Sequence, residues 1–302
     1  MAAIPAPARA ISGAAFATLL LIALMMGANH VAARIAFNNG VDVATAVVFR
    51  SAVTALVIVA LLASQGVRVR FTARHKRFLP AIGLLIGVQS LCLYSAVARL
   101  PVALALLAFN THPLLLSLLS WLSGGERPAK RMLVAMPVAL AGLALALDVV
   151  GRTGDISGRW AEIGAGVLWA SGASLSFAWA MVLTAHKLGS MDGRLRSFLT
   201  MSVVAVLAIA GGTAADAFAL PADATGWSAL AALTVLYGTA ITSLFVVLPK
   251  LGAVNNMAIL NFEPIAVLGM AWVALGQAVA PLQVAGALVV VGAIMWMGSE
   301  RR

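Results

Sequence analysis

A few polar side chains lie inside long apolar runs, where they could bind a small molecule or a proton. Glu263 is the one carboxylate deep in such a run, and it could bind a proton or a substrate ammonium group, or pair permanently with a buried base. Arg34 and Arg50 lie in the first and second runs and could attract a substrate carboxylate. The structural alternatives are snorkelling to the membrane interface for Arg34 and an internal salt bridge for Arg50.

Two prolines near the middle of apolar runs each follow an asparagine by three residues, Pro113 after Asn110 and Pro264 after Asn261. Proline lacks an N–H group, so the carbonyl one turn earlier in a helix loses its hydrogen-bond donor. Each asparagine could bond that loosened backbone or a substrate. The pattern predicts either hinges in two cavity-lining helices or kinks without ligand contact.

The remaining candidates are histidines, amides and aromatic residues of the same runs. His112 either takes part in binding or is a satisfied buried histidine, and the aromatic residues are either cavity walls or packing and interfacial anchors. The predicted substrate-binding or coupling residues are Asn29, His30, Arg34, Arg50, Tyr94, Asn110, His112, Trp169, Asn256, Asn261 and Glu263, with Pro113 and Pro264 as hinges.

Composition indicates that lipid surrounds most of the elements that carry these residues. Of 302 residues, 62% are hydrophobic and 10% are charged, and the mean hydropathy is +1.02. An average soluble domain is about 25% charged, so this chain lacks the polar residues that would cover a water-exposed surface. The net charge of +10 comes from short basic clusters between apolar runs, which is typical of topology signals and not of a nucleic-acid-binding face.

The apolar runs predict an all-α membrane protein with ten transmembrane helices. A helix needs about 20 residues to cross the hydrocarbon core, and these runs lack the two-residue alternation of barrel strands. The predicted helices span about 11–36, 43–63, 79–98, 101–122, 131–149, 161–184, 197–215, 227–248, 253–274 and 281–298.

The distribution of basic residues predicts the orientation of the chain. With ten helices, fifteen of the 20 Lys and Arg residues fall on one side of the membrane, four fall on the other, and Arg50 lies inside a helix. The positive-inside rule then places both termini in the cytoplasm. We therefore expect a multi-pass protein of the inner membrane.

An internal repeat divides the chain into two five-helix units, 1–150 and 151–302. A shift of 151 residues superposes the two Asn–Pro pairs without gaps. Because five is odd, the second unit enters the membrane from the opposite side, giving an inverted repeat around a central cavity. Further superposed pairs are Gly87 with Gly238, His112 with Glu263, Trp121 with Trp272, and Gly125 with Gly276.

Four short motifs resemble those of the drug/metabolite transporter superfamily, and within it the ten-helix EamA-like exporters. The motifs are Met26-Gly27-Ala28-Asn29, Phe49-Arg50, Pro113 followed by Gly125-Glu126-Arg127, and Glu263-Pro264 followed by Gly276-Gln277. Met26 and Gln277 depart from the family's Trp and Glu. The resemblance implies a ten-helix basket that exports small metabolites such as amino acids, and no motif identifies the aromatic amino acid exporters among them.

The repeat and the resemblance together predict an exporter that works by alternating access. The resemblance implies that its substrates are amino acids, with aromatic or other large neutral ones among them, or similar small metabolites. The alternatives are a drug or nucleotide-sugar carrier of the same superfamily and an intramembrane enzyme using His30, His112 and Glu263 as acid/base groups. We expect no catalytic residues, cofactor, metal or nucleic-acid partner. The expected partners are a small-molecule substrate and the lipid bilayer, with a monomer favoured.

Overall fold

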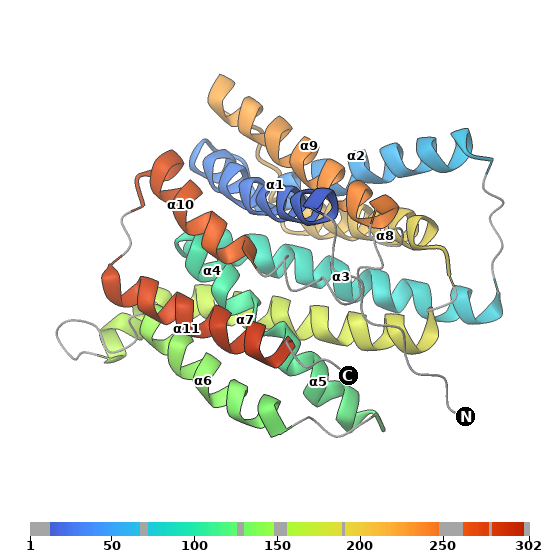
Figure 1. Cartoon of the computed structure of the whole chain (residues 1–302). Helices are drawn as coiled ribbons and strands as arrows, with labels where there is room; N and C mark the ends of the chain where they lie inside the picture. The colour runs from blue at the N-terminus through green and yellow to red at the C-terminus, as the bar shows by residue number, and fades with distance from the viewer. Residues whose placement is uncertain are drawn as a thin grey trace, which may run out of the picture.

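The computed structural model describes residues 13–66, 72–125, 130–147, 156–188, 191–247, 262–277 and 280–298, and within them every regular element is a helix (Figure 1). The helices are α1 (Gly13–Asn38), α2 (Val43–Ser64), α3 (Ala73–Arg99), α4 (Val102–Phe109), α5 (His112–Leu122), α6 (Lys130–Ala146), α7 (Ile156–Lys187), α8 (Gly193–Ala214), α9 (Ala224–Val247), α10 (Glu263–Leu275) and α11 (Pro281–Gly298).

Each predicted helix corresponds to described helical residues, with one difference in continuity. The predicted helix 101–122 is divided into α4 and α5. Residues 253–261 of the predicted ninth helix lie outside the described part of the chain. Within the described residues, seven helical segments are long and apolar enough to cross a membrane, and three further apolar helices are shorter. The chain is therefore a multi-pass helical membrane protein, and ten crossings remain a prediction.

Polar side chains fix several helix ends. Asp42 accepts a hydrogen bond from the backbone N–H of Thr45 at the start of α2, and Asp192 accepts bonds from two backbone N–H groups at the start of α8. Such caps satisfy donors that have no partner inside the helix. The Arg194 side chain, by donating hydrogen bonds to Asp192, lowers the pKa of that carboxyl below its ordinary value and so favours the charged form of this cap.

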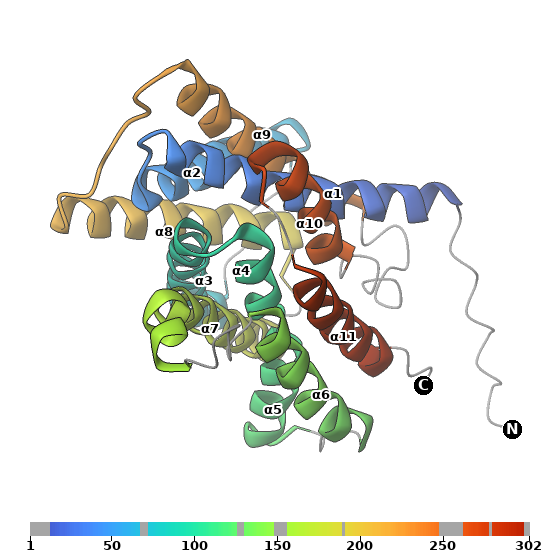
Figure 2. The same ribbon diagram turned by 90° about the vertical axis from the view of Figure 1, so that its left-hand side faces the viewer.

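The helices of the two halves pack in matched pairs. The main contacts are α1 with α9, α3 with α7, α2 with α8, and α6 with α11 (Figures 1 and 2). Smaller contacts join α2 with α9, α3 with α8, α1 with α10, and both α4 and α5 with α7. A shift of 151 residues relates α1 to α7, α2 to α8, α3 to α9, α4 and α5 to α10, and α6 to α11. If each helix in these contacts is replaced by its related helix, the same set of helix pairs results. The packing thus has the internal symmetry that the sequence repeat suggests.

The contact between α6 and α11 depends on glycine. A Cβ atom on Gly286 would lie 2.6 Å from the carbonyl oxygen of Gly142, which is too close for any side chain. Small residues let helix backbones approach closely within a membrane, where packing rather than the hydrophobic effect drives helix association.

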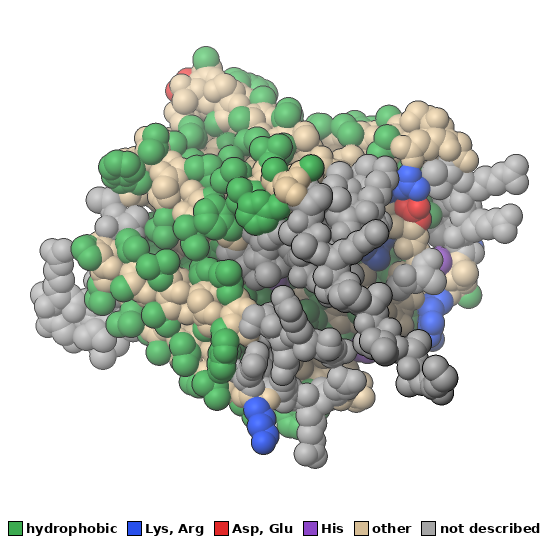
Figure 3. All heavy atoms as spheres, viewed as in Figure 1, with side chains coloured by type: hydrophobic (Ala, Val, Ile, Leu, Met, Phe, Trp, Pro, Cys, Tyr) green, Lys and Arg blue, Asp and Glu red, His purple; other side chains and the backbone are tan. Residues whose placement is uncertain are grey.

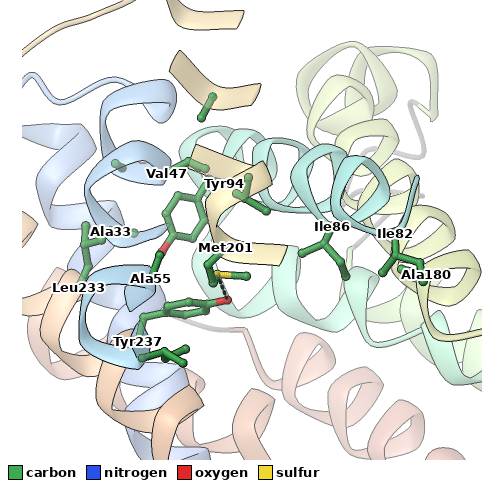
Figure 4. Close-up of a cluster of buried hydrophobic side chains, with 14 of the residues drawn as sticks. Ala33, Val47, Ala55, Ile82, Ile86, Tyr94, Ala180, Met201, Leu233 and Tyr237 are labelled. Atoms are coloured by element: carbon green, nitrogen blue, oxygen red, sulfur yellow. Dashed lines mark hydrogen bonds between the residues drawn. The ribbon is translucent and has the colours of Figure 1, made fainter. Parts of the chain in front are cut away.

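Apolar side chains fill the interior and also cover the surface. The largest buried cluster draws residues from α1, α2, α3, α7, α8 and α9, and it includes Tyr94 and Tyr237 (Figure 4). On the face shown in Figure 3, hydrophobic side chains predominate, and the visible Lys and Arg side chains lie toward its right-hand and lower edges. Large apolar side chains are exposed, Val273 by 77% and Leu168 by 66%. Such a surface is suited to lipid.

Candidate functional site

A buried group of polar side chains lies where helices of the two halves meet. Asn29 of α1 is fully buried, and its Oδ1 accepts a hydrogen bond of 2.8 Å from the Tyr94 hydroxyl of α3. The Tyr94 ring packs edge to face against His30, with 5.9 Å between ring centroids. The Nδ2 group of Asn29 has no hydrogen-bond partner among the described residues.

Arg50 of α2 extends this group to α9. Its guanidinium carbon lies 4.5 Å from the Tyr94 ring centroid and 4.0 Å from that of Tyr237, and its Nη2 donates to Ser90 Oγ at 2.8 Å. The side chain is buried, and its Nε finds no hydrogen-bond partner within the described chain. Tyr237 is held in turn by a contact of 3.7 Å from its hydroxyl to Met201 Sδ (Figure 4).

The structural alternative predicted for Arg50 was an internal salt bridge, and the structure shows a different environment. No carboxylate of the described residues pairs with it. A charged side chain at the bilayer centre costs about 2.5–3.5 kcal/mol on insertion scales. Contact between a cation and an aromatic ring returns about 0.5–2 kcal/mol for each ring. The two tyrosine rings therefore help to stabilise the buried charge of Arg50.

Glu263 and His30 form the acidic end of the polar group. Their Oε1 and Nε2 atoms are 3.5 Å apart, and the side chains are 20% and 4% exposed. An ion pair forms here when His30 is protonated. The contact joins α1 to the first residue of α10, where the helix N-terminus also favours a negative charge. His30 is thus a candidate for the permanent buried partner of Glu263. Binding of a proton or an ammonium group by Glu263 stays a prediction.

Gly27 allows α10 to lie against α1 at this point. A Cβ atom on Gly27 would lie 2.8 Å from Val267 Cγ2 and 2.9 Å from Met270 Cε, both on α10. The motif Met26-Gly27-Ala28-Asn29 therefore has two structural roles. Gly27 permits the close contact between the helices, and Asn29 supplies a polar group two residues later.

The two prolines begin helices. Pro113 and Pro264 are each the second residue of their helix, α5 and α10, where the missing N–H has no intrahelical role. The residues that directly precede these two helices are Thr111 and Phe262, which are 151 positions apart. Their backbone angles are nearly the same: φ is −72° in both, and ψ is −9° in Thr111 and −17° in Phe262. The sequence predicted a hinge or kink within one helix at Pro113, and the structure shows a complete break between α4 and α5 just before it. Hinge motion at either proline remains a prediction.

The break between α4 and α5 is held by local and long-range contacts. Asn110 Nδ2 donates to the Leu106 carbonyl, and the hydroxyls of Thr111 and Ser174 of α7 are 3.0 Å apart. The Nδ1 atom of His112 lies 3.1 Å from the Phe109 carbonyl. Its ring also packs on Phe177 with centroids 4.9 Å apart. His112, and not Asn110, therefore meets the Phe109 carbonyl that lies one turn before Pro113, and a role of either residue in binding stays a prediction.

Several predicted site residues lie apart from the polar group or outside the described residues. Arg34 Nη1 donates to the Val97 carbonyl at 2.8 Å, near the end of α3, so this guanidinium serves the helix terminus. Trp169 is 41% exposed and packs near Arg99. Asn256 and Asn261 fall in the part of the chain that the structure does not describe.

Ser90 was not among the predicted site residues, although it contacts Arg50. A signal was present, since Ser90 is one helical turn before Tyr94 and would share its face. Tyr237 was identified only as one of several aromatic residues.

An open hollow of about 430 Å³ lies at the end of the bundle where α1 meets α2. Phe37 lines this hollow and also packs edge to face on Tyr94, with centroids 5.8 Å apart. A single aromatic layer therefore separates the hollow from the buried polar group. The lining residues are Phe37, Asn38, Val41, Asp42, Val43, Ala98 and Arg99.

Charged groups buried between the halves of a multi-pass helical protein are typical of membrane transporters. A family model described as the EamA-like transporter family matches residues 13–147 and again residues 164–299. The chain belongs to the EamA-like transporter family, whose members transport small molecules across membranes and are not enzymes.

Solved structures agree on the fold. Fourteen solved chains match this one. One of them, a crystal structure, is 18% identical over 95% of this chain and 98% of its own length, with a TM-score of 0.63. At this identity the likeness concerns the fold alone. No curated protein gave a significant match.

Proposed function

We propose that this protein exports amino acids, with large neutral or aromatic ones preferred, across the inner membrane by alternating access. In this proposal ten helices cross the membrane, both termini are cytoplasmic, and units 1–150 and 151–302 are inverted relative to each other. The matched helix contacts and the two family matches support the two units. The asymmetry of basic residues supports the orientation.

The observation that carries the proposal is a buried polar group holding both a carboxylate and a guanidinium. Glu263 and His30 lie at one end and Arg50 at the other, linked through Asn29 and Tyr94. An amino acid presents one ammonium and one carboxylate group, which such a site can recognise together. Neither half supplies the group alone, since Glu263 and Tyr237 come from the second half. The group is complete in one chain, so a monomer suffices.

Counterflow into liposomes tests this function. Purified protein in vesicles preloaded with one unlabelled amino acid should take up the same labelled amino acid in a saturable manner. Large neutral amino acids should give the highest initial rates. Absence of flux for all amino acids would overturn the proposed substrate class, and recovery of chemically altered substrate without net flux would indicate an enzyme.

A further inference from the structure

We propose that Arg50 binds the carboxylate of the transported substrate, in a site completed by Ser90 and walled by the rings of Tyr94 and Tyr237. The inference rests on the proposed function, because it names the group by which that function selects its substrate. Arg50 is buried between helices of both halves, which is where a carrier must hold its cargo.

Three buried hydrogen-bonding groups of α1 and α2 lack a partner among the described residues. They are Arg50 Nε, Asn29 Nδ2 and the hydroxyl of Thr54, which lies one turn along α2 from Arg50. Buried donors are normally satisfied, so Arg50 and Asn29, which both contact Tyr94, can each still bind an acceptor. A carboxylate offers two oxygens that accept several bonds and matches the fork of a guanidinium.

The described protein supplies no such acceptor. Glu263 pairs with His30, Asp42 caps α2, and Asp192 binds Arg194. The segment 248–261, which follows α9, contains no Asp or Glu in its sequence. Among the described residues no carboxylate contacts these donors, and a substrate carboxylate would supply one.

The two tyrosine rings restrict what can approach Arg50. They cover part of the guanidinium with apolar surface, so a ligand must approach along its donor edge. A flat carboxylate on an organic molecule suits such a dry site better than a strongly hydrated inorganic anion. In this proposal the substrate enters from the hollow lined by Phe37, and the packed rings of Phe37 and Tyr94 must separate to admit it.

Competition in the counterflow assay tests the assignment. For the wild-type protein, a transported amino acid should compete at least about 30-fold better than its amide, because loss of one partner of a buried charged pair has an effect of this size. Inorganic phosphate should compete poorly. In Arg50→Gln the preference for the free carboxylate should disappear. Arg74→Gln is the matched control, since Arg74 is exposed on α3 and should retain the wild-type preference.

Arg50→Lys keeps the charge and loses the forked geometry, so it should weaken the preference about tenfold even if Arg50→Gln fails to fold. The proposal is overturned if either folded variant discriminates acid from amide as the wild type does. It is also overturned if phosphate competes as well as the amino acid. A wild-type protein that moves no amino acid would contradict the proposed function instead, which separates the two failures.

Discussion

Replacing Glu263 with glutamine should reduce transport driven by a pH gradient about tenfold or more while leaving the protein folded. Glutamine has nearly the same shape but cannot gain or lose a proton. Glu263 is largely buried, and His30, 3.5 Å away, is its described ionisable partner. If this carboxylate couples proton movement to transport, the variant should lose the pH dependence of net flux. It should keep part of its counterflow, which needs no net proton transfer, although the ammonium group of the substrate loses a charged partner.

The measurement is initial uptake into proteoliposomes at several pH values, with and without an imposed gradient. His30→Gln removes the other member of the pair and should change the pH dependence as well. Thr18→Val is a matched control, because Thr18 lies on α1 in an exposed position where its hydroxyl bonds only the Ala14 carbonyl. Wild-type rates with unchanged pH dependence in Glu263→Gln would remove the coupling role and leave Glu263 as a permanent structural partner of His30.

Replacing Gly27 with valine should reduce counterflow about tenfold or more. The first added carbon would already lie 2.8 Å from Val267 Cγ2 and 2.9 Å from Met270 Cε, and the valine methyl groups add further bulk, so we expect α10 to shift away from α1. Overpacking of this kind typically costs about 1–3 kcal/mol. The shift would move Asn29 and His30 away from Glu263, because these residues are carried by the same two helices.

Gly269→Val is the control for this experiment, since a Cβ on Gly269 of α10 meets nothing within 4 Å. Both variants should give a monodisperse peak in detergent and similar amounts in the membrane. Full transport by Gly27→Val would show that the close contact between α1 and α10 is not needed for the site.

Much of the helical architecture could be predicted from the sequence because hydropathy acts locally. Apolar runs of about 20 residues identify helices regardless of what they contact. The break between α4 and α5 could not be predicted in the same way. Polar residues and Pro113 interrupt the apolar run 101–122 and suggest a kink, but the complete break is held partly by the contact between Thr111 and Ser174, which are 63 residues apart.

The polar candidates could be identified because charged and amide side chains are rare inside membrane helices. Their partners could not be identified, because Arg50 meets Ser90, Tyr94 and Tyr237 only after three helices pack together. The same limit applies to Arg34, whose acceptor is a backbone carbonyl that no side-chain pattern reveals.

The most direct test of a shared, alternately exposed site uses a single cysteine beside Arg50. Cys92 is the protein's one cysteine, so Ser90→Cys in a Cys92→Ala background gives a unique thiol of nearly the serine's size. In right-side-out and inside-out vesicles alike, a membrane-impermeant thiol reagent should modify this residue, and a transported amino acid should slow the reaction. Modification from only one side under all conditions, or no protection by any amino acid, would contradict a substrate site that opens to each side in turn.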